Sequence, residues 1–135
     1  MVVDTSALLA ILFQEREAAE FSELIFQALE VRISTASVLE ASIVLEGRYE
    51  PTRLDLDGAI EELELTIVQF DESILPLARL AFRQYGKGRH PAALNFGDCI
   101  SYATAKRFQE PLLYKGEDFA RTDIIPASRH TSGRE

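Results

Sequence analysis

Residues 2–13 carry the sequence Val2-Val3-Asp4-Thr5-Ser6-Ala7-Leu8-Leu9-Ala10-Ile11-Leu12-Phe13. The β-branched pair predicts a short buried strand, and the apolar run after Ser6 predicts a helix that follows at once. Asp4 would then lie at the carboxyl end of the strand, where open parallel sheets place their ligands. The stretch predicts an α/β fold with an acidic site anchored on Asp4. A simple helix N-cap at Asp4 or Thr5 is the alternative, since these residue types favour that position.

The composition is that of one folded domain. The chain has 135 residues, of which 47% are apolar and 27% charged, and this length buries about two-thirds of the unfolded surface without disulfides. The single cysteine, Cys99, permits no internal disulfide. No apolar run reaches the roughly 20 residues of a membrane helix, and we see no signal peptide. We therefore expect a cytoplasmic protein.

The formal net charge of −8 limits how the protein can contact nucleic acid. Tight, indiscriminate binding to phosphates requires clustered Lys and Arg. Any contact with nucleic acid is therefore expected to be local or to involve a metal ion.

Strands alternate with helices along the rest of the chain. We expect helices over 17–29, 35–49, 51–64, 72–85 and 95–109, and strands over 31–34, 65–70, 111–114 and 123–126. Strands separated by helices imply right-handed crossovers and a parallel sheet. The predicted fold is a three-layer α/β sandwich with a mostly parallel sheet of four to five strands. We expect residues 1–126 to form one domain and residues 127–135 to form a polar, flexible tail.

Four acids belong to segments that leave the same edge of the predicted sheet: Asp4, Glu40, Asp98 and Asp118. Carboxylates gathered at one place repel one another unless a cation joins them, and hard divalent ions prefer oxygen ligands. We therefore expect a Mg²⁺ site, with Mn²⁺ as a possible substitute.

Each of these acids also has a purely structural interpretation. Ser37 with Glu40 matches a capping box, and Asn95 with Asp98 resembles one. Asp118 can close a turn through its own backbone. Taken singly, these interpretations are at least as good as the functional one, but four acids at one edge favour a site.

Several strings together resemble the PIN-domain ribonucleases of the VapC type, in order and over nearly the whole chain. These strings are Val3-Asp4-Thr5-Ser6-Ala7-Leu8, Ser34-Thr35-Ala36-Ser37-Val38-Leu39-Glu40, Tyr85-Gly86-Lys87-Gly88, Leu94-Asn95-Phe96-Gly97-Asp98-Cys99, Tyr102-Ala103 and Leu112-Leu113-Tyr114-Lys115-Gly116-Glu117-Asp118-Phe119. The resemblance implies a PIN-like fold, Mg²⁺-dependent endoribonuclease activity and the role of toxin in a toxin–antitoxin pair. It also implies a homodimer and a cognate antitoxin that blocks the site.

The resemblance assigns the acidic set to Asp4, Glu40, Asp98 and Asp118, with Asp4 and Asp98 as the direct metal ligands. Ser6 matches the hydroxyl residue that steadies the first acid. The chain departs from the family at Glu117, where many relatives carry a neutral residue, and Asp123 is nearby. The fourth acid therefore stays open between Asp118, Glu117 and Asp123.

Basic residues near the last long predicted helix are candidates for binding RNA phosphates. They are Arg83, Lys87, Arg89, His90 and Lys115. The alternative is a solvated loop and helix face without a ligand, which is what charged runs usually form.

Three other functions compete with the ribonuclease. A phosphatase of the haloacid dehalogenase type expects a second acid two residues after the first, where this chain has Ser6. A response-regulator receiver expects paired acids on its first loop and a phosphoacceptor after a middle strand, for which Asp71 is a poor match. A catalytically inactive PIN-like binding module is the third. Cys99 is not expected to be a nucleophile, because no base is placed to activate it.

Overall fold

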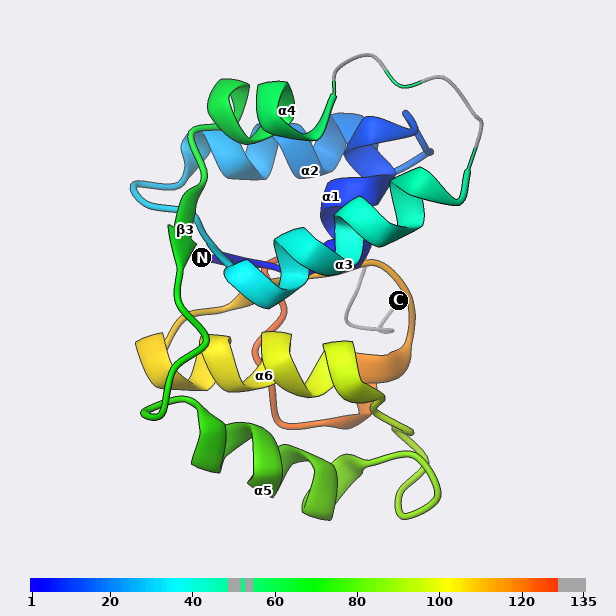
Figure 1. Cartoon of the computed structure of the whole chain (residues 1–135), viewed down its shortest axis with the longest axis vertical. Helices are drawn as coiled ribbons and strands as arrows, with labels where there is room; N and C mark the ends of the chain where they lie inside the picture. The colour runs from blue at the N-terminus through cyan, green and yellow to red at the C-terminus, as the bar shows by residue number, and fades with distance from the viewer. Residues whose placement is uncertain (49–51, 53–54, 129–135) are drawn as a thin grey trace.

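The computed structural model describes residues 1–48, 52 and 55–128. Within them, four short strands form one parallel sheet in the order β3-β2-β1-β4 (Figure 1). The strands are β1 (Val2–Val3), β2 (Arg32–Ser34), β3 (Thr66–Val68) and β4 (Leu112–Leu113). Val2 pairs with Arg32 on one side and with Leu112 on the other. The predicted parallel sheet is therefore confirmed, and β1 lies in its interior.

Helices cover both faces of the sheet. Their bounds are α1 (Thr5–Leu12), α2 (Ala18–Gln27), α3 (Thr35–Glu46), α4 (Leu56–Glu62), α5 (Leu75–Tyr85), α6 (Phe96–Phe108) and the 3₁₀ helix η1 (Asp118–Arg121). Figure 1 shows α1 to α4 on one side of the strands and α5 with α6 on the other. The predicted three-layer α/β arrangement is confirmed. None of the helices in the described ranges is long and apolar enough to cross a membrane.

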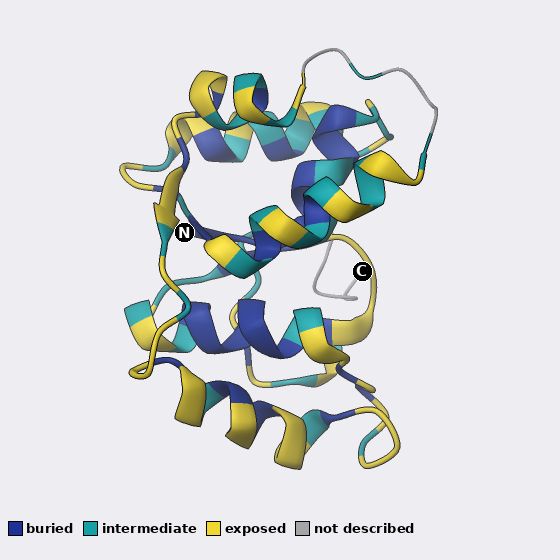
Figure 2. Cartoon of the chain, viewed as in Figure 1, coloured by how far each residue is buried: buried dark blue, intermediate teal, exposed yellow. Residues whose placement is uncertain are grey.

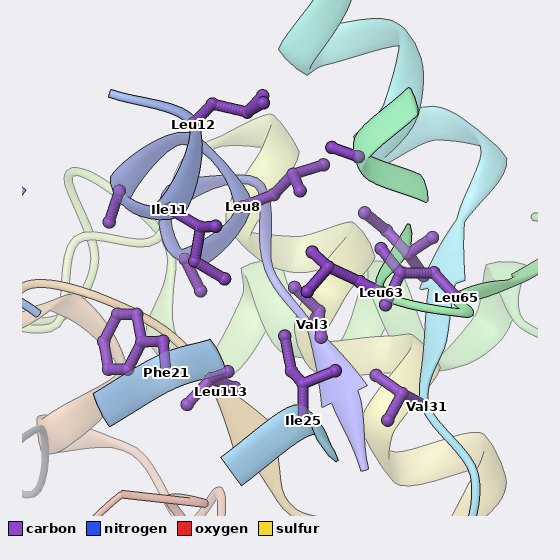
Figure 3. Close-up of a cluster of buried hydrophobic side chains, with 14 of the residues drawn as sticks. Val3, Leu8, Ile11, Leu12, Phe21, Ile25, Val31, Leu63, Leu65 and Leu113 are labelled. Carbon is purple, nitrogen blue, oxygen red and sulfur yellow. The ribbon is translucent and has the colours of Figure 1, made fainter. Parts of the chain in front are cut away.

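Two hydrophobic cores lie on the two faces because successive strand residues point in opposite directions. Val3 and Leu113 belong to the core beneath α1, α2, α3 and α4 (Figure 3). Val2 and Leu112 belong to the core formed with α5, α6 and η1. All four side chains are at most 1% exposed. The central strands are thus buried on both faces, as expected of a parallel sheet between helices.

Several elements are shorter than their sequence patterns predicted. Helix α3 ends at Glu46, because Gly47 caps it. Helix α4 begins at Leu56, where the Asp55 side chain accepts a hydrogen bond from Gly58 N at 2.7 Å. Residues 49–51 and 53–54, which the predictions placed in helices or between them, lie outside the described residues. A local cap therefore decides each of these two ends.

The strand predicted over 123–126 is wrong. Its backbone forms only an isolated bridge between Pro126 and Leu112, with Leu112 N donating to Ile125 O at 2.9 Å and Ala127 N to Leu112 O at 2.9 Å. These two bonds come from the residues on either side of Pro126, and in the described part of the chain the pairing with β4 does not continue beyond this bridge. Of the predicted tail, Ala127 packs against the core and Ser128 donates a hydrogen bond to Glu20 at 2.7 Å; residues 129–135 lie outside the described part.

Leu8→Ala should destabilise the fold by about 2–5 kcal/mol, because it leaves a cavity in the core under α1. Leu8 is 0% exposed. The control is Leu29→Ala, which alters a leucine that is 107% exposed and should change stability by no more than about 0.5 kcal/mol. Urea denaturation followed by circular dichroism measures both, and equal losses would contradict this description of the core.

Candidate active site

Asp4 occupies the end of β1 and is buried, with 5% of its surface exposed. Its Oδ2 accepts hydrogen bonds from Ser6 N at 3.0 Å and from Ser6 Oγ at 2.6 Å. Its Oδ1 accepts from Ser101 Oγ on α6 at 2.5 Å. Asp4 is also the N-cap of α1. The predicted N-cap at Asp4 is therefore confirmed, and the capping carboxylate lies at the edge of the sheet.

Asp98 lies in the first turn of α6, where it forms a capping box with Asn95. Asn95 N donates to Asp98 Oδ2 at 3.0 Å, and Asp98 N donates to Asn95 Oδ1 at 2.9 Å. The pKa of Asp98 is raised from 3.8 to about 7, chiefly by burial and also by the nearby carboxylates of Asp4 and Asp118. The structure thus brings Asp4, Asp98 and Asp118 close enough to interact electrostatically.

Glu40 lies between the segments that carry Asp4 and Asp98. Its Oε1 accepts a hydrogen bond from Thr5 Oγ1 at 2.7 Å. Its Oε2 lies where Gly97 has no side chain, since a β-carbon at position 97 would be 2.5 Å from that oxygen. Glu40 therefore contacts Thr5, which follows Asp4 in the chain, and Gly97, which precedes Asp98.

The capping box predicted between Ser37 and Glu40 is wrong. Ser34 caps α3 instead, accepting from Ala36 N at 3.2 Å. The reason is that the helix begins at Thr35, one residue after the strand ends, which leaves Ser37 inside the first turn. The Glu40 carboxylate is consequently free of a capping role.

The three candidates for the fourth acid lie in different surroundings. Asp118 opens η1 and interacts with Asp98. Glu117 is exposed and makes no side-chain cap to η1. Asp123 accepts hydrogen bonds from Tyr102 Oη at 2.6 Å and Lys106 Nζ at 3.0 Å. The geometry favours Asp118, because Asp123 is already held by two donors.

Four of the five predicted RNA-binding residues lie close together in the chain, just before α6. Arg83 lies in the last turn of α5, and Lys87, Arg89 and His90 lie in the loop that leads to the N-terminus of α6 (Figure 1). Arg121 of η1 donates to Pro91 O in the same loop at 3.2 Å, so the loop and η1 are joined.

Two of the predicted residues, His90 and Lys115, have partners within the protein. His90 Nδ1 accepts from Ala92 N at 3.0 Å, and the His90 ring packs edge-on against Tyr85. Lys115 Nζ forms ion pairs with Glu15 at 2.7 Å and Glu17 at 3.5 Å. The charge of Lys115 is thus engaged within the protein, which weakens its case as a phosphate ligand.

The acidic set fits a Mg²⁺ ion by its chemistry. Within the described residues, no three Asp, Glu, His or Cys side chains already form a metal-binding group. Mg²⁺ commonly keeps several waters and binds proteins through one or two carboxylates. Asp4 and Asp98 supply two carboxylates whose mutual repulsion a divalent cation would relieve.

The profile of the PIN domain matches residues 1–125. The chain belongs to the PIN-domain family. The PIN domain is similar to the protein named Ribonuclease VapC from Mycolicibacterium smegmatis, with 47% identity over 92% of this chain and 97% of that one. It is also similar to Ribonuclease VapC30 from Mycobacterium tuberculosis, with 48% identity over 92% of this chain and 95% of that one. The predicted membership of the VapC-type PIN domains is confirmed.

A solved structure supports the fold of this PIN domain. A chain from a toxin–antitoxin complex of Klebsiella pneumoniae superposes with a TM-score of 0.67 over 94% of this chain and 97% of that one. At 19% sequence identity, this similarity shows the fold alone.

Three hydroxyl residues make contacts in the candidate site that the sequence patterns did not predict: Thr5 and Ser101 each donate to an acid, and Ser37 contacts Ser101. All three are at most 5% exposed, although their side chains are polar. The available signal is spacing, since Ser37 and Ser101 each lie three residues from an acid on a helix and so share its face. A hydroxyl at that spacing on an otherwise apolar helix face could have been proposed as a partner for the acids.

Asp98→Asn should stabilise the metal-free PIN domain more at high pH than at low pH. Because the pKa of Asp98 is raised to about 7 on folding, the folded state binds more protons than the unfolded chain between 3.8 and about 7. The wild type therefore loses stability as the pH rises through that window. Melting temperatures in EDTA should show the advantage of Asp98→Asn growing from about pH 5 to about pH 8.

The control for these melting-temperature measurements is Glu61→Gln, which neutralises an exposed acid on α4. Its effect on the melting temperature should vary less with pH. If Asp98→Asn gave the same advantage at both pH values, the raised pKa of Asp98 would be contradicted.

Proposed function

We propose that this PIN-domain protein is a metal-dependent endoribonuclease that acts as the toxin of a toxin–antitoxin pair. The observation that carries the proposal is the interaction of three carboxylates, Asp4, Asp98 and Asp118, at the carboxyl edge of the sheet. The relatives at 47% and 48% identity, which are named ribonucleases, support the same reaction.

Each acid has a role that follows from its position. Asp4 and Asp98 hold Mg²⁺ or Mn²⁺, because they are the two partly or fully buried carboxylates that repel each other. The bound ion would lower the pKa of a coordinated water and offset charge on the phosphate oxygens. Glu40 orients the attacking water and accepts its proton, since Thr5 occupies only Oε1. Asp118 completes the acidic set from the exposed side.

RNA is the substrate, and the loop before α6 holds its phosphates. Lys87 and Arg89 of this loop and Arg83 in the last turn of α5 are exposed, and the loop leads directly into the helix that carries Asp98. The positive charges compensate locally for the net charge of −8, which otherwise repels a polyanion.

The partners in this proposal are a cognate antitoxin and a second copy of the chain in a homodimer, and the compartment is the cytoplasm. Exposed apolar side chains on α3, α5 and α6 supply a surface for protein contacts, as such patches usually mark interfaces. The residues are Leu39, Ile43, Leu75, Phe82 and Phe96. Figure 2 shows the outward side of α5 as largely exposed.

Asp4→Ala and Asp98→Ala should each reduce Mg²⁺-dependent RNA cleavage by at least about a hundredfold, because the bound ion contributes several kcal/mol to the transition state. Cleavage of a fluorescent RNA library, followed by mapping of the new ends, measures the loss. Asp57→Ala, which removes an exposed acid of α4, is the control and should cleave normally. Full activity in either site variant, or wild-type cleavage in excess EDTA, would overturn the proposal.

Arg89→Glu should weaken RNA binding and lower its dependence on salt, because one phosphate contact is lost. Binding of a non-cleavable RNA to the Asp98→Ala background, measured by fluorescence anisotropy over a salt series, reports both. Arg107→Glu makes the same change of charge at the other end of α6 and should have a smaller effect. Equal effects of the two variants would mean that the loop before α6 is only a solvated surface.

A further inference from the structure

The Asp4 carboxylate is held by neutral hydrogen-bond donors. In the part of the chain that the structure describes, these donors are Ser6 N, Ser6 Oγ and Ser101 Oγ. A buried carboxylate needs such donors, because leaving one of its oxygens unpaired costs the desolvation energy of a charged group. None of these three donors carries a positive charge that would compete with a cation for the Asp4 carboxylate.

The donors differ in what they can fix. Ser6 lies two residues after Asp4, so it sets only the local orientation of the carboxylate. Ser101 lies 97 residues away on α6, the helix that also presents Asp98. Because Asp98 and Ser101 are three residues apart on that helix, their side chains share one face. The hydrogen bond from Ser101 therefore ties the position of Asp4 to the helix that carries the other proposed ligand.

A second serine extends this arrangement to α3. Ser37 Oγ lies 3.4 Å from Ser101 Oγ, and the two side chains are 2% and 1% exposed. Each hydroxyl has a single hydrogen to donate. Since Ser101 gives its hydrogen to Asp4, Ser37 must be the donor in the contact between the serines. The hydrogen bonds then run in one direction, from Ser37 through Ser101 to Asp4, and each strengthens the next.

The two helices use the same spacing. On α3, Ser37 precedes Glu40 by three residues, and on α6, Ser101 follows Asp98 by three residues. Thr5 Oγ1, which donates to Glu40, is also 3.2 Å from Ser37 O. The buried hydroxyls thus connect the segments of Asp4, Glu40 and Asp98 beneath the carboxylates.

We propose that Ser101 is a positioning residue that, supported by Ser37, fixes the Asp4 carboxylate relative to Asp98 for binding a divalent cation. This inference rests on the proposed metal-dependent function. Ser101 itself does not contact the ion or the RNA. Its effect is to hold Asp4 Oδ1 in one orientation, so that ion binding requires no rearrangement.

The test measures Mn²⁺ alone, by electron paramagnetic resonance of the free ion in a titration of the whole protein. Ser101→Ala should weaken Mn²⁺ binding roughly 10- to 100-fold, the usual effect of removing a group that orients a metal ligand. Ser101→Thr retains the hydroxyl and should restore most of the affinity. The deficit of Ser101→Ala in RNA cleavage should shrink as Mn²⁺ is raised, since the missing contact affects ion binding.

The matched control is Thr104→Val, on the same helix. Thr104 is 0% exposed, and its Oγ1 donates to Ile100 O at 2.8 Å, away from the acids. This variant removes a buried hydroxyl without touching Asp4, so Mn²⁺ affinity should stay at the wild-type value even if the melting temperature falls. Equal losses of affinity in Ser101→Ala and Thr104→Val, or wild-type affinity in Ser101→Ala, would overturn the inference.

Two further results separate the possible failures. A wild-type protein that binds no Mn²⁺ would overturn the proposed metal site itself, whereas wild-type binding that Ser101→Ala leaves unchanged would overturn only the role of Ser101. If Ser101→Ala does not fold, Ser37→Ala takes its place. That variant keeps the bond from Ser101 to Asp4 but removes its support, so we expect a smaller loss of Mn²⁺ affinity, and no loss would contradict the inference.

Discussion

The burial of one charged carboxylate at the end of the central strand is the constraint on which the rest of the site depends. Asp4 is 5% exposed and meets only neutral donors in the described part of the chain. Such a group is tolerated in a protein interior only when its oxygens are hydrogen-bonded. The serines that satisfy Asp4 come from α1 and α6, so the packing of α6 on the sheet and the orientation of the acid are linked.

The structural role and the proposed functional role coincide at two of the acids, because both place the carboxylate at the start of a helix. Asp4 caps α1, and Asp98 forms a capping box at the start of α6. Free N–H groups and the positive end of the helix dipole stabilise a carboxylate there. Repulsion from the other acids and burial act in the opposite direction, and burial prevails at Asp98, whose pKa rises to about 7. The capping role of each acid is therefore compatible with the proposed role as a metal ligand.

The parallel sheet explains why acids from distant positions meet. Each strand ends at the same edge, and α1 and α3 begin within a residue or two of β1 and β2. Glu40 is then one turn and a half into α3, which places its carboxylate against Thr5 and Gly97. A side chain at position 97 would occupy the space of that carboxylate. Glycine is therefore favoured at this position for steric reasons, whatever the backbone conformation.

The sequence by itself determined the order of strands and helices, the parallel three-layer fold and the acids that approach one edge, because hydrophobic periodicity and strand-to-helix turns are local properties. It misjudged the capping of α3, where Ser34 is the cap instead of Ser37, and the strand at 123–126, where the described backbone pairs with β4 at a single bridge. Only the tertiary structure decided that Asp118 accompanies Asp98 while Asp123 is held by Tyr102 and Lys106. It alone also placed Ser101 against Asp4, because a contact between residues 97 positions apart depends on how two helices pack and leaves no local trace in the chain.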